Sequence, residues 1–335
     1  MTIAIVGAGA IGGLLGVKLA EAGEDVTFIA RGRNLEAIRA GGMTLVEEGG
    51  REVHARNVRA TESMAEAGPH EIVLLTVKAH QLGPIAADLA HLVGPETLLV
   101  TMQNGIPWWY FLHGFDGPLA GTRLESVDPG GTVASHLDPA RVIGSVVYPA
   151  AILAAPGRVE HVEGLRFGLG ELDGQMTPRV QALAARLIKA GFRTPVTKDI
   201  RAELWLKLWG NLSFNPISAL THATLVDICT FPDTRALAAE MMREAQAVAN
   251  ALGVSFKLGI EARIAGAEKV GAHKTSMLQD IEAGRAVEIE ALVGSVIELG
   301  RLVGVPTPHI GTAFALMRLL ARSVERAGRG LSLDA

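Results

Sequence analysis

The feature that most constrains the fold of this 335-residue chain is a glycine-rich turn between a short apolar run and a helical pattern. Ile3 to Val6 is wholly apolar, as expected of a strand buried on both faces, and runs directly into GAGAIG at residues 7–12. Leu14 to Ala22 then predicts a helix, and Val26 to Ala30 a second strand. This βαβ context predicts a dinucleotide-binding unit, and a purely structural glycine turn is the weaker alternative.

The glycines of this turn have separate physical roles. Gly7 permits the tight turn, Gly9 lets the backbone approach a pyrophosphate, and Gly12 allows close packing of helix and strand. The phosphates then lie at the helix N-terminus, where unpaired N–H groups and the helix dipole favour anions. We therefore expect the loop to bind a dinucleotide through Gly7, Ala8, Gly9, Ala10, Ile11 and Gly12.

The end of the second predicted strand selects between the two nicotinamide cofactors. NAD-binding units usually place Asp or Glu there to hold the ribose hydroxyls. This chain instead has ARGRN at residues 30–34, without an acid. A guanidinium suits a phosphate geometrically, so Arg31 is predicted to bind the 2′-phosphate of NADP(H). Arg33 is either a second phosphate contact or a solvated loop residue.

Two later predicted strands end in polar residues. Glu71 to Val77 leads to Lys78, and Thr97 to Met102 leads to Asn104. Ligands of open parallel sheets bind beyond the carboxyl ends of the strands, so both side chains are expected at the edge that carries the glycine loop. Each also has a simpler interpretation, Lys78 as a solvated residue that starts a helix and Asn104 as a turn residue before Gly105.

The helix predicted over Arg201 to His222 carries an unusual polar stripe. Lys207, Asn211 and Asn215 recur at every fourth position, so they lie close together on one helix face. Unpaired buried polar groups cost about 1–3 kcal/mol each, so a stripe set among apolar residues needs partners or a ligand. The alternative is a surface pair of Glu203 with Lys207 beside two solvated asparagines. The surrounding apolar residues are Leu204, Trp205, Leu208, Trp209, Leu212 and Phe214.

Helical patterns replace strand signals in the second half of the chain. Pro216 lacks an N–H and is expected to kink the first of these helices. Ser276 lies near the start of the helix predicted over His273 to Glu282, either as part of a Ser-x-x-Gln capping box or as a ligand contact, and Glu288 adds an acid to an otherwise apolar pattern. Further predicted helices are Pro178 to Ala190, Thr234 to Leu252, His273 to Glu282, Ala286 to Leu302 and His309 to Ala327. Further predicted strands are a hairpin of Met43 to Val46 with Glu52 to Val58, then Arg141 to Tyr148, Arg158 to Val162 and Leu165 to Leu169.

Composition excludes several other classes of protein. A formal net charge of −4 provides no excess of basic residues for binding nucleic acid. We also find no apolar run of the roughly 20 residues that are needed to span a bilayer. The single cysteine, Cys229, fits a reducing compartment and packing better than nucleophilic catalysis, so a cytoplasmic protein is expected. The histidines show no metal-ligand spacing, so no metal is predicted. The helical half is apolar enough to bury a homodimer contact, although no motif specifies one.

With these residues in view, the chain resembles the ketopantoate reductase (2-dehydropantoate 2-reductase) family over most of its length. The resemblance rests on GAGAIG, Arg31, VKAHQ with Lys78, QNG with Asn104, AELWLKLWGNLSFNP, and SMLQDI followed by Glu288. It implies an α/β Rossmann-type dinucleotide-binding domain, residues 1–198, followed by an all-α C-terminal domain, residues 199–335. NADPH and a small-molecule 2-oxo acid would meet between these domains.

The same resemblance implies a reaction and roles for individual residues. NADPH would reduce 2-dehydropantoate to (R)-pantoate, a step of pantothenate biosynthesis, with Lys207 as general acid. The implied substrate contacts are Asn211, Asn215, Ser276, Glu288 and Asn104, and the residues near the nicotinamide are Lys78 and Asn104.

Two segments depart from the family pattern. Ile106 to Tyr110 is bulky where the family has small residues and an acid, and Ser145 to Pro149 replaces a stretch rich in Thr and His. If these segments border the pocket, the substrate is another, more apolar 2-oxo acid. If Trp108 and Trp109 only pack a loop, they say nothing about the substrate. A non-catalytic NADP-binding sensor is a third hypothesis, and it has no need of a proton donor such as Lys207.

Overall fold

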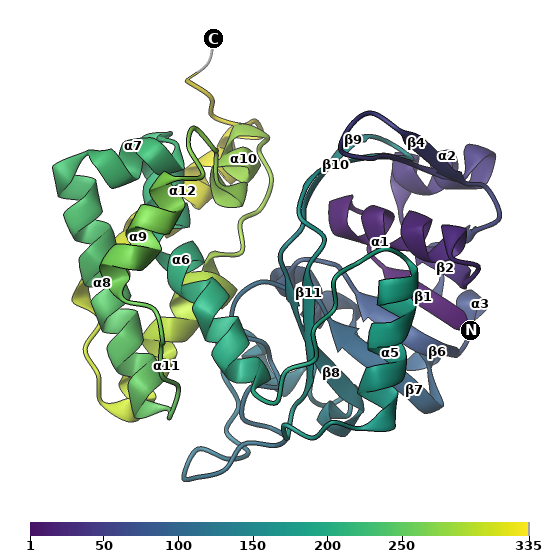
Figure 1. The fold of residues 1–335 in the computed structure, drawn as a ribbon, viewed down its shortest axis with the longest axis horizontal. Helices are drawn as coiled ribbons and strands as arrows, with labels where there is room; N and C mark the ends of the chain where they lie inside the picture. The colour runs from purple at the N-terminus through teal and green to yellow at the C-terminus, as the bar shows by residue number, and fades with distance from the viewer. Residues whose placement is uncertain (334–335) are drawn as a thin grey trace. The chain divides into compact units, whose positions relative to one another are not determined.

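The computed structural model describes residues 1–333, and internal contacts divide the chain into two compact units (Figure 1). Unit 1 comprises Met1–Gln103 and Pro107–Ile200. Unit 2 comprises Asn104–Ile106 and the chain from Arg201 onward. The short segment Asn104–Ile106 therefore belongs to unit 2, although the residues on both sides of it along the chain belong to unit 1.

Unit 1 is built on a seven-stranded sheet in the order β11-β8-β7-β6-β1-β2-β5. All neighbouring strands are parallel except β11, which runs antiparallel to β8. From β1 the chain builds outward through β2 to β5, and it then crosses to the other side of β1 to add β6, β7 and β8. Such a switch point is where doubly wound sheets bind nucleotides. The strands are β1 (Thr2–Val6), β2 (Asp25–Ile29), β5 (Arg59–Thr61), β6 (His70–Leu75), β7 (Val93–Thr101), β8 (Val142–Val147) and β11 (Phe167–Glu171).

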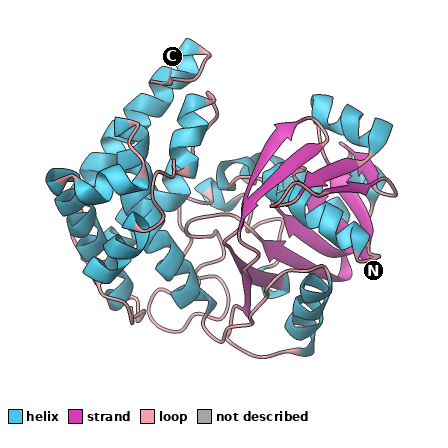
Figure 2. Ribbon diagram, turned by 45° about the horizontal axis from the view of Figure 1, so that its top comes forward, coloured by secondary structure: helices cyan, strands magenta, loops and turns pink. Residues whose placement is uncertain are grey.

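A second sheet of four strands, in the order β4-β3-β10-β9, completes the strands of unit 1 (Figure 2). The predicted hairpin is confirmed, because β3 (Met43–Val46) pairs antiparallel with β4 (Glu52–Ala55). Neither β5 nor β9 (Ala150–Ala155) is predicted from the sequence. β5 has only three residues, and β9 is an alanine-rich strand whose residues are largely exposed, so neither shows a burial pattern. The remaining strand is β10 (Arg158–Glu163).

Helix α1 (Ala10–Glu21) packs against both sheets, and two of its glycines make this possible. A Cβ added at Gly16 would lie 2.2 Å from the ring of Phe28 in β2, and one at Gly13 would lie 2.5 Å from Val159 in β10. The missing side chains therefore let the helix approach each sheet closely, which holds its N-terminus beside the end of β1. The other helices of unit 1 are α2 (Gly32–Gly41), α3 (Met64–Ala67), α4 (Ala86–Leu89) and α5 (Pro178–Lys189), with short 3-10 turns between strands.

Unit 2 is all-α and is organised around α6 (Ile200–Thr221). The apolar residues predicted to surround the polar stripe are all buried. Trp209 donates its indole N–H to the carbonyl of Met242 in α8 over 2.7 Å and stacks on Phe256 with ring centres 4.3 Å apart. Pro216 lies inside α6, and the helix is continuous past it. The other elements are α7 (Leu225–Thr230), α8 (Pro232–Ala251), α9 (Ile260–Glu268), α10 (Ser276–Glu282), the π-helical turn η6 (Glu290–Gly294), α11 (Ser295–Val303) and α12 (Pro308–Ala327).

Three sequence predictions for unit 2 are incomplete or wrong. Helices α7 and α9 are not predicted, because both are short. Ser276 is not the cap of α10, since Thr275 holds that position and its hydroxyl accepts from the backbone N–H of Leu278. The helix predicted from Ala286 begins later, and Glu288 stands just before it in irregular chain.

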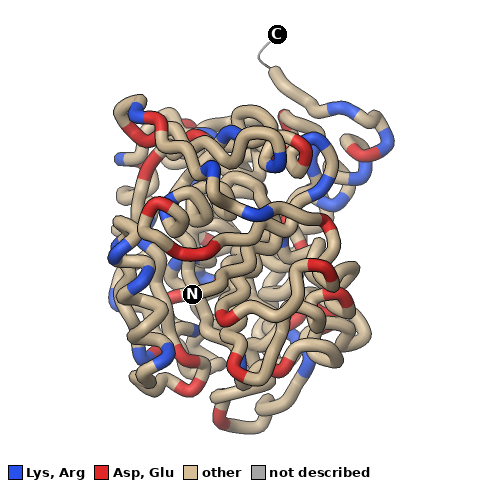
Figure 3. The backbone as a smooth tube through the Cα atoms, turned by 90° about the vertical axis from the view of Figure 1, so that its right-hand side faces the viewer, with Lys and Arg blue, Asp and Glu red and all other residues tan. Residues whose placement is uncertain are grey.

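Charged residues of both signs are distributed along the chain. Figure 3 shows Lys and Arg interspersed with Asp and Glu along the backbone trace, in a chain whose formal net charge is −4. Within residues 1–333, no helix combines the length and the apolar character needed to cross a membrane.

Candidate active site

The glycine loop of unit 1 has the steric properties that a dinucleotide requires. A Cβ added at Gly12 would lie 2.0 Å from the carbonyl oxygen of Gly7, so any other residue there would push helix and strand apart. A Cβ at Gly9 would meet no atom within 4 Å, which leaves open space beside the backbone. Gly9 also caps α1 without a side-chain hydrogen bond, and no acid occupies the first turn. The loop therefore fits a pyrophosphate at the helix N-terminus.

Two side chains that the sequence analysis does not single out hold this loop in place. The hydroxyl of Thr76, just beyond β6, donates to the carbonyl of Gly7 over 2.7 Å. The amide of Asn34 donates to the carbonyl of Ala8 over 2.6 Å, and its oxygen accepts from the backbone N–H of Gly157 over 2.8 Å. Thr76 could have been found from its position directly after β6, whereas Asn34 lies in the first turn of α2 and has no comparable signal in the sequence.

The predicted phosphate contact, Arg31, lies two residues beyond β2 and is the N-cap residue of α2. Its side chain is exposed, as is that of Arg33, and neither makes an ion pair or hydrogen bond with another residue in the described part of the chain. Both guanidinium groups are therefore available to a ligand. Lys78 is half-buried and starts the 3-10 turn η1 (Ala79–Gln81), with its backbone N–H donating to Oε1 of Gln81 over 3.0 Å.

In unit 2 the structure brings Lys207 and Asn104 together. Nζ of Lys207 donates to Oδ1 of Asn104 over 2.6 Å, across 103 positions of sequence. Burial lowers the pKa of Lys207 to about 8, while the charge of Glu288 opposes this shift. An ammonium with this pKa is fully charged at slightly acid pH and can release its proton near neutrality. This is the behaviour expected of a general acid.

Three of the predicted substrate residues, Asn211, Asn215 and Ser276, offer polar side-chain groups without hydrogen-bond partners among residues 1–333. Asn211 and Asn215 share the face of α6 that carries Lys207, and Asn215 is only 6% exposed. Neither amide hydrogen-bonds to another residue within 1–333, nor does the hydroxyl of Ser276, which is exposed at the first turn of α10. Helix α10 lies beside the end of α6, where Nδ1 of His222 is 3.9 Å from Glu282.

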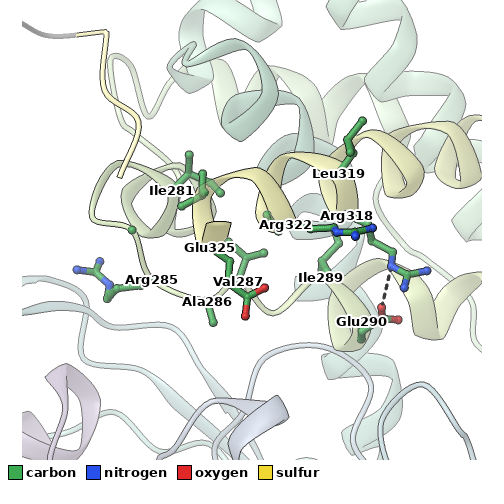
Figure 4. A pocket seen from close by; sticks show the side chains of 13 residues that line it. Ile281, Arg285, Ala286, Val287, Ile289, Glu290, Arg318, Leu319, Arg322 and Glu325 are labelled. Atoms are coloured by element: carbon green, nitrogen blue, oxygen red, sulfur yellow. Dashed lines mark ion pairs between the residues drawn. The ribbon is translucent and has the colours of Figure 1, made fainter. Parts of the chain in front are cut away.

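A cavity of about 830 Å³ within unit 2 does not contain this constellation. It lies between α12 and the segment before η6, and Figure 4 shows Arg318 and Arg322 on its helical side. Val287 and Ile289 line it, but Glu288 between them does not, and neither do Lys207 and the asparagines of α6. The cavity is therefore distinct from the polar stripe.

The bulky segment after Asn104 packs largely into unit 1. Trp109 is fully buried, and its indole N–H donates to the hydroxyl of Thr101 in β7 over 2.9 Å. Trp108 is 4% exposed, and its indole N–H has no hydrogen-bond partner among the described residues. Tyr148 is half-buried beneath the guanidinium of Arg166, which lies 4.6 Å from the ring centre. Trp109 is thus a packing residue of unit 1.

The lone cysteine is also a packing residue. Cys229 is 1% exposed in α7, and its thiol contacts the carbonyl of Ile264 at 3.6 Å. Burial raises the pKa of this thiol, which keeps it protonated and unreactive.

Comparison with known proteins identifies relatives over the whole chain. The family model described as ketopantoate reductase PanE/ApbA matches residues 3–108, and the model of the C-terminal part of that family matches residues 199–321. The chain is 56% identical to the 2-dehydropantoate 2-reductase of Mesorhizobium japonicum, over 97% of this chain and 99% of the relative.

Solved structures agree with this assignment. A protein of Ralstonia solanacearum, solved as a candidate ketopantoate reductase, superposes with a TM-score of 0.92 at 42% identity, over 96% of this chain and 98% of that one. D-mandelate dehydrogenase bound to NADH and anilino(oxo)acetate shares the fold, with a TM-score of 0.82 at 22% identity, over 97% and 99% of the two chains.

The fold and these relatives define the class of protein first. It is an oxidoreductase that interconverts CH–OH and C=O groups with a nicotinamide cofactor. Within that class, the chain belongs to the ketopantoate reductase family.

Proposed function

We propose that this protein reduces 2-dehydropantoate to (R)-pantoate with NADPH, a step of pantothenate biosynthesis, and that Lys207 donates the proton. The observation that carries the proposal is the half-buried lysine on α6, whose pKa is lowered to about 8 and whose amine donates to Asn104 over 2.6 Å. The name of the 56% identical relative supplies the substrate.

The proton chemistry follows from the charge that develops on the substrate. NADPH, when bound, supplies a hydride to the 2-oxo carbon, and negative charge then grows on the ketone oxygen. An ammonium group beside that oxygen stabilises the charge and then transfers a proton to it. Asn104 orients the amine, and Glu288 favours its charged form, so Lys207 enters the reaction protonated.

The substrate contacts are assigned to polar groups on α6, at the start of α10 and beside Lys207. The amides of Asn211 and Asn215 can donate to the carboxylate of a 2-oxo acid, and Asn104 can reach the ketone beside Lys207. The hydroxyl of Ser276 adds another donor, and Glu288 can accept a hydrogen bond from the hydroxyl of the substrate. The amides of Asn211 and Asn215 support this assignment, because neither is used in a hydrogen bond with another described residue and both lie on the face of α6 that carries Lys207.

The cofactor assignment rests on unit 1. The glycine loop, Gly7 to Gly12, is proposed to bind the pyrophosphate, with Lys78 and Asn104 near the nicotinamide. Arg31 is proposed to bind the 2′-phosphate and so to favour NADP(H) over NAD(H), supported by its exposed and unpaired guanidinium. In this assignment residues 1–198 bind the cofactor and residues 199–335 bind the substrate. A cytoplasmic location and a homodimer stay predictions.

A second candidate is a reductase of another, more apolar 2-oxo acid. It is favoured by Trp108, whose buried indole N–H lacks a partner and could donate to a substrate. It is weakened by Trp109, whose indole is already used inside unit 1. The D-mandelate dehydrogenase fold also accommodates a bulkier oxo acid, although it shares only the fold with this chain.

A substrate screen separates these candidates. NADPH and NADH oxidation should be followed with 2-dehydropantoate and with a series of 2-oxo acids of increasing apolar bulk. The proposal expects the highest kcat/KM with 2-dehydropantoate and NADPH. If 2-dehydropantoate is turned over weakly and a bulkier 2-oxo acid is turned over strongly, the protein is instead a reductase of that bulkier acid.

A further inference from the structure

The π-helical turn η6 changes the hydrogen bonding of the helix that follows Glu288. In this turn the backbone N–H of Ser295 donates to the carbonyl of Glu290, five residues earlier. An α-helix would direct the same N–H to Ala291, four residues earlier. The turn therefore releases the carbonyl of Ala291 from its usual partner inside the helix. Such single π turns occur often at functional sites.

The released carbonyl binds the segment that carries Asn104. The backbone N–H of Ile106 donates to Ala291 O over 2.9 Å, and the fully buried hydroxyl of Ser295 donates to the same oxygen over 2.7 Å. Ala291 O thus holds a segment from a distant part of the sequence against the start of α11. All of these groups belong to unit 2.

Gly105 is the residue that makes this attachment possible. Its φ is +91°, a left-handed conformation that residues with a side chain rarely adopt. A Cβ at this position would lie 2.2 Å from Ala291 O, the same atom that accepts from Ile106. Any larger residue would therefore both strain the turn and separate it from the helix.

We propose that η6 is a positioning device for Lys207, in which Ala291 O and Ser295 hold Gly105 and Ile106 so that the Asn104 amide meets the lysine amine. This inference deepens the proposed function and rests on Lys207 as its proton donor. Gly105 and Ser295 are positioning residues, because they act on the reacting groups only through Asn104.

The same segment also positions the second group that acts on Lys207. Glu288 stands two residues before η6, and its carbonyl accepts from the backbone N–H of Leu292 inside the turn over 3.1 Å. One short stretch, residues 288–295, therefore fixes both the backbone of Glu288 and the segment that carries Asn104. A simpler interpretation is that η6 only packs α11, and this predicts no effect of the turn on the titration of Lys207.

Gly105→Ala tests the device, and Gly304→Ala is its matched control. Gly304 also has a positive φ, +73°, but a Cβ there would meet no atom within 4 Å. Both variants place a side chain at a residue of positive φ, and only Gly105→Ala brings that side chain against Ala291. Each should be compared with the parent for kcat, for the KM of NADPH, and for the apparent pKa of Lys207, measured by acetylation at graded pH and peptide mass spectrometry.

We expect Gly105→Ala to lower kcat about a hundredfold, the effect of a displacement near 1 Å at a reacting centre, with the KM for NADPH unchanged. The apparent pKa of Lys207 should fall, because its charged form loses an acceptor. Gly304→Ala should leave both quantities at parental values. Ser295→Ala, which keeps the Ile106 hydrogen bond, should lower kcat by a smaller factor, roughly two- to tenfold.

A folded Gly105→Ala protein with parental kcat and parental Lys207 titration would overturn the inference. If Gly105→Ala does not fold, Ser295→Ala becomes the test. A parental kcat together with a parental pKa of Lys207 in Ser295→Ala would then overturn the inference. Failure of the proposed function is a separate outcome, seen as an inactive parent. The acetylation experiment needs no substrate and still tests the positioning in that case.

Discussion

Lys207 donates a hydrogen bond to Asn104 over 2.6 Å, although the two residues are 103 positions apart and Asn104 follows a strand of unit 1. The amide oxygen fixes where the ammonium points, so its loss should leave the lysine present but poorly aimed. We expect Asn104→Ala to lower kcat by roughly ten- to a hundredfold, an effect of 1.5–3 kcal/mol for a hydrogen bond to a charged group. Steady-state kinetics at pH 7 would measure this. A parental kcat would show that Asn104 does not orient the lysine.

The pH dependence of the reaction should report the titration of Lys207. Its pKa is lowered from 10.5 to about 8, chiefly by burial. Reduction requires the protonated amine, so kcat/KM for the oxo acid should be level at lower pH and fall as pH rises through about 8. Oxidation of the hydroxy acid requires the neutral amine and should rise over the same range. Profiles that move in the same direction in both reactions would contradict the role of Lys207.

Removal of the amine should stop chemistry while cofactor binding persists. Lys207→Ala is expected to lower kcat about 10²- to 10⁴-fold, the usual contribution of a general acid, with an unchanged Kd for NADPH. Lys207→Arg keeps the positive charge but cannot release a proton near neutrality, so it should also be slow and should lose the titration near pH 8. Lys269→Ala, at an exposed lysine of unit 2, is the control and should match the parent. The measurements are pre-steady-state reduction and fluorescence titration of NADPH.

The sequence predicts the nucleotide-binding unit and the polar stripe of α6 well, because each is a local pattern. A glycine loop is specified by neighbouring residues, and helical spacing alone aligns Lys207 with Asn211 and Asn215. What it does not predict is long-range or irregular. The side chain of Asn34 in α2 donates a hydrogen bond to the carbonyl of Ala8 in the glycine loop. Thr275, not Ser276, is the N-cap of α10. The turn η6 is π-helical and so contains one residue more than an α-helical turn. Such features depend on which backbone and side-chain groups come into contact in the folded chain, and hydrophobic periodicity does not predict those contacts.

Cofactor preference should depend on Arg31. Its exposed guanidinium stands at the end of β2, where NAD-binding units usually carry an acid. We expect Arg31→Ala to raise the KM for NADPH by roughly ten- to a hundredfold, the effect of losing a hydrogen-bonded charge pair, and to leave the KM for NADH nearly unchanged. Arg33→Ala, two positions away and equally exposed, is the matched comparison. An equal loss with both cofactors would show that Arg31 does not recognise the 2′-phosphate.

The charge of Glu288 should set the pH range in which the enzyme reduces its substrate. This carboxylate raises the pKa of Lys207 against the effect of burial. Glu288→Gln removes the charge, so the fall in kcat/KM should move from about pH 8 to lower pH. Asn104→Asp adds a carboxylate to the same amine and should move the fall in the opposite direction, to higher pH. The two variants keep side-chain size nearly constant, so opposite displacements of one pH profile would be hard to attribute to altered packing. Displacement in the same direction, or none, would show that another group controls the titration.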